Sequence, residues 1–146
     1  IPLRLVGSEM CIRDSLYNYV NQSWKTQQLI DTILHTQYFN NPNGLSGNED
    51  CGQMSAWYVL NAMGFYQVCP GSPIYSVGRP IFDKVTINLP NGKVFEIIAN
   101  NNSRTNKYIQ SIRLDNILLE SPFFMHSDIM KGGKIVMEMG NTPVKQ

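Results

Sequence analysis

The spacing of hydrophobic residues changes once along this 146-residue chain, close to Ser72. Before that point, apolar residues return at helical intervals in WKTQQLIDTILHTQY (residues 24–38) and in GQMSAWYVLNAMG (residues 52–64). After it, KVTINLPNGKVFEIIA (residues 84–99) is rich in β-branched residues in alternating order. We therefore expect an α+β chain, in which a helical hairpin is followed by antiparallel β structure. The same change of pattern also fits the junction of two larger domains.

Local signals indicate where these elements begin and end. Ser23 can cap the first helix, and the second helix is expected to start near Asp50 or Cys51 and to end at Gly64 in a left-handed cap. The Asn91-Gly92 pair favours a tight hairpin because both residues accept positive φ. The remaining signals are two strand candidates and a turn before the second of them: YIQSIRL (residues 108–114), KIVMEM (residues 134–139) and Gly132-Gly133.

Composition excludes several classes of function. The chain is 42% hydrophobic with a formal net charge of +1, which is typical of one globular domain or of a piece of a larger one. Its 12 basic residues are balanced by 11 acidic ones and form no dense stripe, so neither a nucleic-acid partner nor a polybasic membrane patch is expected. No apolar run approaches the roughly 20 residues that a membrane-spanning helix needs.

The stretch RLVGSEMCIRDS (residues 4–15) has an unusual origin in our interpretation. Back-translated in one frame, it resembles a common transposase-type sequencing adaptor. We therefore treat residues 1–15 as a non-native, adaptor-derived segment, and we expect the natural N-terminus and its signal peptide to be missing. Without Cys11, two cysteines remain, Cys51 and Cys69, which could form a disulfide or could both be buried thiols.

The stretch GNEDCGQ (residues 47–53) places two adjacent carboxylates before the second helix. The Asp50 carboxylate can accept hydrogen bonds from backbone N–H groups of the first helical turn, where the helix dipole favours negative charge. Alternatively, one carboxylate can hold a hard cation while the other holds a water molecule. Residue chemistry leaves both roles open.

Other candidates for chemistry are weaker. His126 and Asp128 could bind a metal, but no cysteine or second histidine is near them in the sequence, so a loop role is favoured. Cys51 has no histidine nearby to act as a base, and His35 is interpreted as a surface or interhelical polar residue. The two tryptophans fall on apolar helix faces and are predicted to lie in the core: Trp24 and Trp57.

Three stretches carry a family resemblance. The first is WKTQQLIDTIL (residues 24–34), the second runs from NPNGLSGNEDCGQ to YIQSIRLD (residues 41–115), and the third is MHSDIMKGGKIVMEMGNTP (residues 125–143). Together they resemble the C-terminal part of the glycoside hydrolase family 92 exo-α-mannosidases. The resemblance covers the chain from Leu16 to its end. It implies a calcium-dependent, inverting hydrolysis of terminal α-mannosides, often α-1,2-linked, in mannose-containing glycans. It also implies a periplasmic or secreted bacterial enzyme.

The resemblance further implies a domain organisation. The family is built from a β-sandwich and an (α/α)6 barrel, so residues 16–71 would be the last helical hairpin of the catalytic helical domain. Residues 72–146 would then form a C-terminal β-rich segment that packs on the sandwich.

Site residues are carried over within the GNEDCGQ motif. Asp50 resembles the general base, Glu49 a calcium ligand and Asn48 a substrate-binding residue. An inverting glycosidase needs two carboxyl groups roughly 6.5 to 9.5 Å apart on opposite faces of the sugar, so adjacent residues cannot supply both. The acid would lie upstream, and we expect this chain alone to be inactive. The alternatives are a free-standing β-rich carbohydrate-binding or interaction module and a homologue that has lost its activity.

Overall fold

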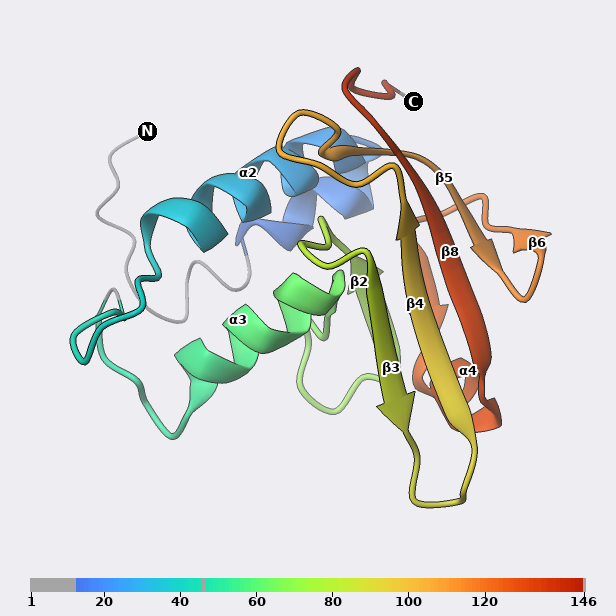
Figure 1. Cartoon of the computed structure of the whole chain (residues 1–146), viewed down its shortest axis with the longest axis horizontal. Coiled ribbons are helices and arrows are strands. Elements are labelled where there is room, and N and C mark those ends of the chain that lie inside the picture. Colours follow the sequence, from blue (N-terminus) through green and yellow to red (C-terminus); the bar gives the residue numbers. More distant parts are fainter. Residues whose placement is uncertain (1–12, 46, 146) are drawn as a thin grey trace.

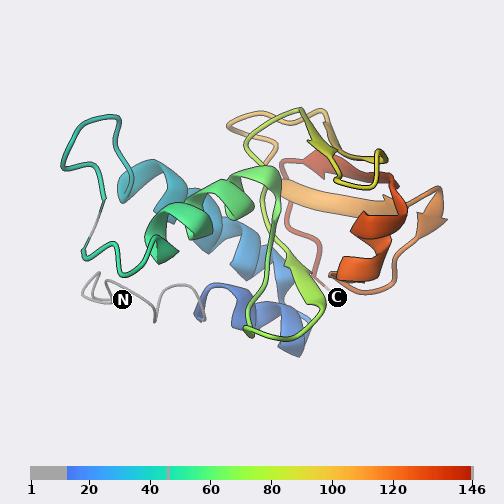
Figure 2. The same cartoon turned by 90° about the horizontal axis from the view of Figure 1, so that it is seen from below.

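The computed structural model describes residues 13–45 and 47–145, which form a helical part beside a β-rich part (Figure 1). The α+β expectation is therefore confirmed. The helical part contains three elements: the 3-10 helix η1 (Ser15–Val20), α2 (Ser23–Thr36) and α3 (Gln53–Met63). Figure 2 shows α2 and α3 next to each other, on one side of the β structure.

The β-rich part contains a small and a large sheet. The three-stranded sheet has the order β1 (Phe65–Tyr66), β2 (Ile74–Val77), β7 (Phe123–Met125). The five-stranded sheet has the order β3 (Lys84–Asn88), β4 (Val94–Asn100), β8 (Gly133–Gly140), β5 (Tyr108–Leu114), β6 (Ile117–Leu118). A short helix, α4 (His126–Lys131), joins β7 to β8.

Most local signals act as the sequence predicts. Gly64 ends α3 with φ of 106°, and its N–H bonds to the carbonyls of Leu60 and Asn61. The hairpin that contains Asn91-Gly92 joins the antiparallel strands β3 and β4, with positive φ at Gly92 but not at Asn91. Ser23 differs from expectation because it is the first residue of α2 rather than its cap. Its hydroxyl is buried and has no hydrogen-bond partner in the described part of the chain.

The expectation of purely antiparallel β structure is wrong for one strand pair. β8 pairs with β5 in antiparallel fashion, but it pairs with β4 in parallel, from Phe95 opposite Gly133 to Asn100 opposite Glu138. The physical reason lies in the connection from β4 to β8. β5 runs back along the sheet, and α4 then returns the chain to the start of β4, where Gly132 approaches the Val94 carbonyl. The last strand therefore enters from the same end as β4 and fills the gap between β4 and β5.

Two hydrophobic clusters hold the parts together. Alternating residues of β4 and β8 are almost completely buried: Phe95, Ile97, Ile135 and Met137. A second cluster lies between the two long helices, where Ile30 and Leu34 of α2 contact Trp57 of α3.

A buried ion cluster connects α2 to the β-rich part. The guanidinium of Arg79 is almost inaccessible, and its Nε atom lies 3.1 Å from the Asp31 carboxylate of α2. Lys107 and His35 also contact this carboxylate. Burial lowers the pKa of Arg79, while the neighbouring Asp31 charge opposes that shift. Arg79 also donates to the carbonyls of Pro80 and Ser103, whereas its Nε and Asp31 Oδ1 are close enough for an ion pair but form no hydrogen bond among the described residues.

Candidate active site

The loop between α2 and α3 is anchored at its start. Tyr38 donates a hydrogen bond from its hydroxyl to the Met54 carbonyl at 3.0 Å, and its ring stacks on Trp57 with centroids 5.7 Å apart. The loop then turns tightly, with the Phe39 N–H bonded to the Gly44 carbonyl at 2.9 Å. Only glycine fits at position 44, because a Cβ atom there would lie 1.8 Å from the Phe39 carbonyl oxygen.

The chain enters α3 through a left-handed turn. Asp50, Cys51 and Gly52 have φ values of 35°, 59° and 85°. The Gln53 N–H, the first in α3, bonds to the carbonyls of Glu49 and Asp50 at 3.1 and 3.2 Å. Positive φ is costly for residues other than glycine, on the order of 1–3 kcal/mol each, and such strain concentrates at functional sites.

Glu49, and not Asp50, caps α3. Glu49 Oε1 accepts a hydrogen bond from the Ser55 N–H at 3.1 Å, whereas no side chain caps the helix from position 52. The expected cap from Asp50 is therefore wrong. The left-handed turn at Asp50 offers a physical reason, because it directs the backbone into the helix while the longer Glu49 side chain reaches back to the helix terminus.

The two carboxylates have different surroundings. Asp50 is exposed, and its carboxylate has no hydrogen-bond or ionic partner among residues 13–45 and 47–145. Glu49 Oε2 is buried without a partner in the same described ranges. Asn48 is exposed directly before them. The structure thus places all three residues of the carried-over site at one helix terminus, with one carboxylate toward solvent and one partly enclosed.

This arrangement fits one part of a hard-cation site. Calcium takes six to eight oxygen ligands, often from carboxylates, and the orphaned Glu49 Oε2 is such an oxygen. The described residues contain no group of three or more His, Cys, Asp or Glu side chains that could hold a metal ion. Glu49 can therefore act as one ligand, and other ligands would have to be added to complete a site.

His126 and Asp128 do not form a metal site. His126 is the first residue of α4 rather than a loop residue, and its Nδ1 lies 3.1 Å from the Tyr75 hydroxyl. Asp128 accepts a hydrogen bond from the Met125 N–H at 2.9 Å and pairs with Lys131. These contacts cap and stabilise the short helix.

Neither alternative for the cysteines is borne out. Cys51 and Cys69 are both free and both exposed, so they form neither a disulfide nor a pair of buried thiols. His35 is partly buried, and its contacts with Asp31 lie within α2, so the structure shows an intrahelical rather than an interhelical contact. These groups provide no cysteine–histidine pair for nucleophilic catalysis.

The core position predicted for Trp57 is confirmed, and the structure adds a partner for it. Trp57 is completely buried, and its Nε1 donates to the Asp14 carboxylate at 3.1 Å. Burial raises the pKa of Asp14 from 3.8 to about 7. Asp14 belongs to the segment interpreted as adaptor-derived, of which residues 1–12 lie outside the described residues. Trp24 is only partly buried, and Lys25 Nζ lies 5.4 Å from its ring centroid.

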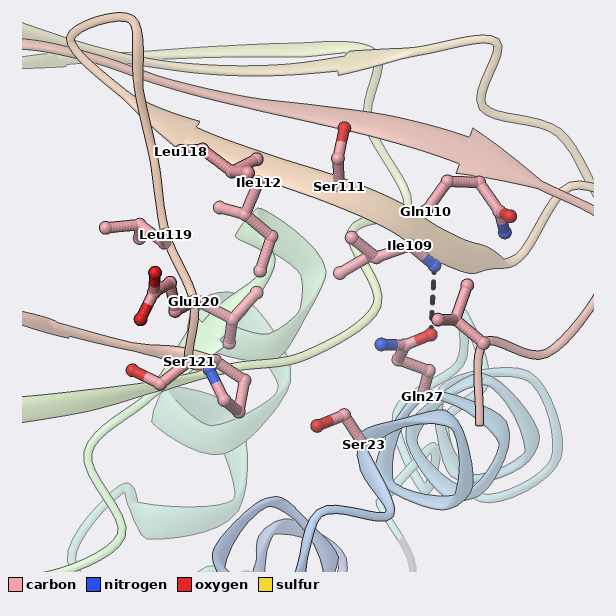
Figure 3. Close-up of a pocket in the computed structure, with 13 residues that line it drawn as sticks. Ser23, Gln27, Ile109, Gln110, Ser111, Ile112, Leu118, Leu119, Glu120 and Ser121 are labelled. Atoms are coloured by element: carbon pink, nitrogen blue, oxygen red, sulfur yellow. Dashed lines mark hydrogen bonds between the residues drawn. The ribbon is translucent and has the colours of Figure 1, made fainter. Parts of the chain in front are cut away.

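A separate pocket of about 270 Å³ lies between α2 and β5 (Figure 3). In it, Gln27 of α2 accepts a hydrogen bond from the Ile109 N–H at 2.9 Å, while Glu120 and Ser121 line the opposite side. Asn48, Glu49 and Asp50 do not line this pocket, so it is distinct from the carboxylate loop.

Within the described residues, no helix is both long enough and apolar enough to span a membrane.

The comparison with known families identifies the class of protein. The sequence model for the Glycosyl hydrolase family 92 catalytic domain matches residues 14–141. The chain therefore belongs to glycosyl hydrolase family 92, in agreement with the resemblance described above.

Solved structures agree with this assignment. The family GH92 α-mannosidase BT3965 from Bacteroides thetaiotaomicron, in complex with mannoimidazole, is 39% identical, with a TM-score of 0.87 over 92% of this chain and 18% of that one. The family GH92 inverting mannosidase BT2199 from the same species is 40% identical, with a TM-score of 0.83 over 90% of this chain and 18% of that one.

A curated relative is more distant. It is an uncharacterized secreted glycosidase from Arthroderma benhamiae, 25% identical over 128 residues, which are 86% of this chain and 16% of the relative. The chain therefore spans less than a fifth of the length of each of these three relatives.

Proposed function

We propose that this chain is part of a longer, calcium-dependent, inverting exo-α-mannosidase that hydrolyses terminal α-mannosides of glycans. The observation that carries the proposal is the different environment of two adjacent carboxylates at the start of α3: Asp50 faces solvent without a partner, and Glu49 Oε2 is buried without one. Membership in family 92 and the similarity to two bacterial mannosidases support it.

Asp50 is assigned the role of general base. Its carboxylate has no competing partner in the described part of the chain, so it is able to accept a proton from a water molecule. The strained φ of 35° fixes the direction in which it leaves the turn. Asn48, exposed two residues earlier, is assigned to binding of a substrate hydroxyl through its amide.

Glu49 is assigned the role of a calcium ligand through Oε2. Its Oε1 is held by the Ser55 N–H, so the carboxylate orientation is set by α3 before any ion binds. When bound, calcium would coordinate the oxygens of neighbouring hydroxyl groups of a mannose ring and hold them in place. Glu49 itself contributes orientation and one negative charge to that coordination.

The general acid must come from another part of the longer protein. Inversion requires the acid on the face of the sugar opposite the base, roughly 6.5 to 9.5 Å away, and Glu49 is adjacent to Asp50. We therefore infer that this chain alone is inactive. Residues 1–15 remain interpreted as adaptor-derived.

The helical hairpin of α2 and α3 is assigned to the end of an (α/α)6 barrel, with the β structure from residue 72 packing on a β-sandwich. Exposed apolar side chains support a missing neighbour on this side, because Val59 of α3 is 54% exposed and Phe39 is 59% exposed.

A periplasmic or secreted location is proposed, supported by the secreted relative from Arthroderma benhamiae.

A free-standing carbohydrate-binding module is less well supported. Such a module would be expected to show aromatic side chains exposed on its strands. The large hydrophobic side chains exposed on the described strands are aliphatic or methionine: Ile74, Val94, Ile117, Leu118 and Met125. The exposed Phe and Tyr side chains lie outside the strands instead: Tyr19, Phe39 and Phe82.

The test measures mannose release from an α-mannobioside by the longer protein, with calcium and with a chelator. We expect Asp50→Asn to lower kcat by at least about 100-fold, as is typical for loss of a general base. We expect Glu49→Gln to weaken calcium binding and therefore to raise the calcium concentration needed for activity. Asp83→Asn serves as the matched control because this exposed carboxylate lies outside the loop. A folded parent protein that is inactive on α-mannosides would refute the proposed function.

A further inference from the structure

Tyr38 and Glu49 bond to the two polar groups of a single peptide unit. The Tyr38 hydroxyl donates to the Met54 carbonyl oxygen at 3.0 Å, and the Ser55 N–H donates to Glu49 Oε1 at 3.1 Å. The Met54 carbonyl and the Ser55 N–H belong to the same planar peptide unit, in which they point in opposite directions. This peptide unit therefore connects a tyrosine to a carboxylate of the proposed active site.

The two hydrogen bonds reinforce each other. A carbonyl oxygen only accepts, so the Tyr38 hydroxyl is the donor, and its donation polarises the peptide unit. That polarisation makes the Ser55 N–H a stronger donor to Glu49 Oε1. Hydrogen bonds to a carboxylate are also stronger than those between neutral groups. Tyr38 therefore acts on Glu49 without touching it.

The Ser55 N–H depends on Glu49 because of its place in α3. It is the third N–H of the helix, and N–H groups of a first helical turn have no carbonyl partner within the helix. The next N–H, that of Ala56, bonds to the Gly52 carbonyl at 3.0 Å. Two adjacent N–H groups thus report on different interactions, one with the Glu49 side chain and one with the backbone of the turn.

Aromatic neighbours determine where the Tyr38 hydroxyl lies. The Tyr38 ring stacks on Trp57, with centroids 5.7 Å and planes 9° apart, and it contacts the Tyr58 ring at 4.8 Å. Met54, Trp57 and Tyr58 share one face of α3, since residues three and four apart in a helix are neighbours. Trp57 is completely buried. The donor is therefore held by the hydrophobic core between the helices.

We propose that Tyr38 is a positioning residue for the Glu49 carboxylate and acts through the peptide unit between Met54 and Ser55. This inference rests on the proposed function, in which Glu49 Oε2 binds calcium. A carboxylate is planar, so a hydrogen bond that holds Oε1 also fixes the direction of Oε2, which is buried without a partner in the described part of the chain. The Tyr38 hydroxyl therefore raises calcium affinity by preorganising one ligand.

Three variants of the longer protein separate the hydroxyl from the ring. Tyr38→Phe removes the hydroxyl and keeps the ring that stacks on Trp57. Tyr38→Leu removes both and shows the effect of lost packing. Tyr58→Phe is the matched control, because Tyr58 belongs to the same aromatic cluster and its hydroxyl has no hydrogen-bond partner among the described residues.

Amide hydrogen exchange, resolved to single residues in the calcium-free protein, tests the pair of hydrogen bonds. We expect Tyr38→Phe to speed exchange of the Ser55 N–H about threefold to tenfold, which corresponds to the loss of one hydrogen bond. The Ala56 N–H should stay within about twofold of wild type. Tyr38→Leu should speed exchange at both positions, since lost stacking loosens the whole first turn. Tyr58→Phe should change neither.

Calorimetric titration with calcium tests the consequence for ligand binding. We expect Tyr38→Phe to raise the calcium Kd about fivefold, while kcat at saturating calcium and KM for an α-mannobioside stay within about twofold of wild type. A loss of folded protein would instead lower the rate at every calcium concentration. Tyr58→Phe should bind calcium as the wild-type protein does.

Other outcomes overturn the inference. Unchanged Ser55 exchange in Tyr38→Phe would show that the hydroxyl does not act on the bond to Glu49. Equal acceleration at Ser55 and Ala56 would show that Tyr38 only packs. Faster Ser55 exchange with an unchanged calcium Kd would contradict the role in positioning a ligand. A wild-type protein that binds no calcium and releases no mannose would refute the proposed function, and Ser55 exchange would still decide whether Tyr38 holds Glu49.

Discussion

Glu49 accepts a hydrogen bond from the backbone N–H of Ser55 through Oε1, while its Oε2 is buried without a partner in the described part of the chain. One carboxylate therefore has two functions available to it. The first oxygen stabilises the start of α3, and the second is a buried acceptor whose desolvation is uncompensated until a cation or a donor reaches it. Stability and ligand binding should accordingly respond differently to changes at this residue.

Two substitutions at Glu49 separate these functions. Glu49→Ala should lower the free energy of unfolding by about 1 kcal/mol through loss of the cap. Glu49→Gln should keep most of this capping contribution, because an amide oxygen still accepts the hydrogen bond from the Ser55 N–H. Both variants should reduce the rise in thermal midpoint that calcium produces in the longer protein. Glu120→Gln, an exposed residue outside the loop, is the control for charge. A wild-type calcium response in Glu49→Gln would contradict the ligand role.

The left-handed turn into α3 predicts a backbone effect at Gly52. Its φ is 85°, and the nearest atom to an added Cβ, Glu49 Oε1, is 3.9 Å away, so strain rather than collision decides the outcome. Gly52→Ala should destabilise the protein by about 1–2 kcal/mol in urea denaturation. Gly52→Asn should cost less, because asparagine tolerates this region better. Equal effects of alanine and asparagine would show that the turn adjusts its backbone.

The pair of Asp31 and Arg79 predicts a large loss when one partner is neutralised. Their side chains are only 15% and 3% exposed, so Asp31→Asn leaves a buried guanidinium without its counter-charge. We expect a loss of about 3–5 kcal/mol in the free energy of unfolding. Glu96→Gln breaks the more exposed pair with Lys84 and should cost less than about 1 kcal/mol. Similar losses in the two variants would show that Arg79 reaches solvent.

Asp14 predicts a specific pH dependence for this 146-residue chain. Its pKa is about 7 in the fold, above the ordinary 3.8, so the folded state holds a proton that the unfolded state releases. The contribution of protonated Asp14 to the free energy of unfolding is complete below about pH 4. It decreases as the pH rises toward 7, by on the order of 1 kcal/mol per pH unit.

Asp14→Asn tests this dependence. The variant should be more stable than the original chain above pH 7, with the decrease between pH 4 and 7 removed. Urea denaturation at several pH values measures it. Parallel stability curves for the two chains would contradict the shifted pKa.

The parts of the fold that depend on neighbours in the sequence were predictable. Gly64 and Gly92 mark a helix end and a hairpin, and both take the positive φ that glycine favours, whereas Asn91 does not take the positive φ expected of it. The parallel pairing of β4 with β8 was not predictable in this way. It depends on where the segment from residue 101 to residue 132 returns the chain, and no local pattern encodes that path.

The candidate site shows the same division. The GNEDCGQ motif predicted that both carboxylates precede the second helix, and they do, but the capping residue depends on backbone angles, so that Glu49 and not Asp50 caps α3. A cavity between the α2–α3 loop and α3 combines Phe39 with Tyr58, which are far apart in the sequence and on different elements. Their shared chemistry becomes visible only when the loop has folded against α3.

The position of β8 has a consequence for the order of folding. A ribosome makes β4 and β5 well before β8, yet these strands have no ladder with each other and meet only through the last strand. Until residues 133–140 emerge, both strands present an open edge, and such edges are prone to pair with other chains. The five-stranded sheet therefore closes late in synthesis, and chains that stop short of β8 should aggregate instead of folding into a smaller sheet.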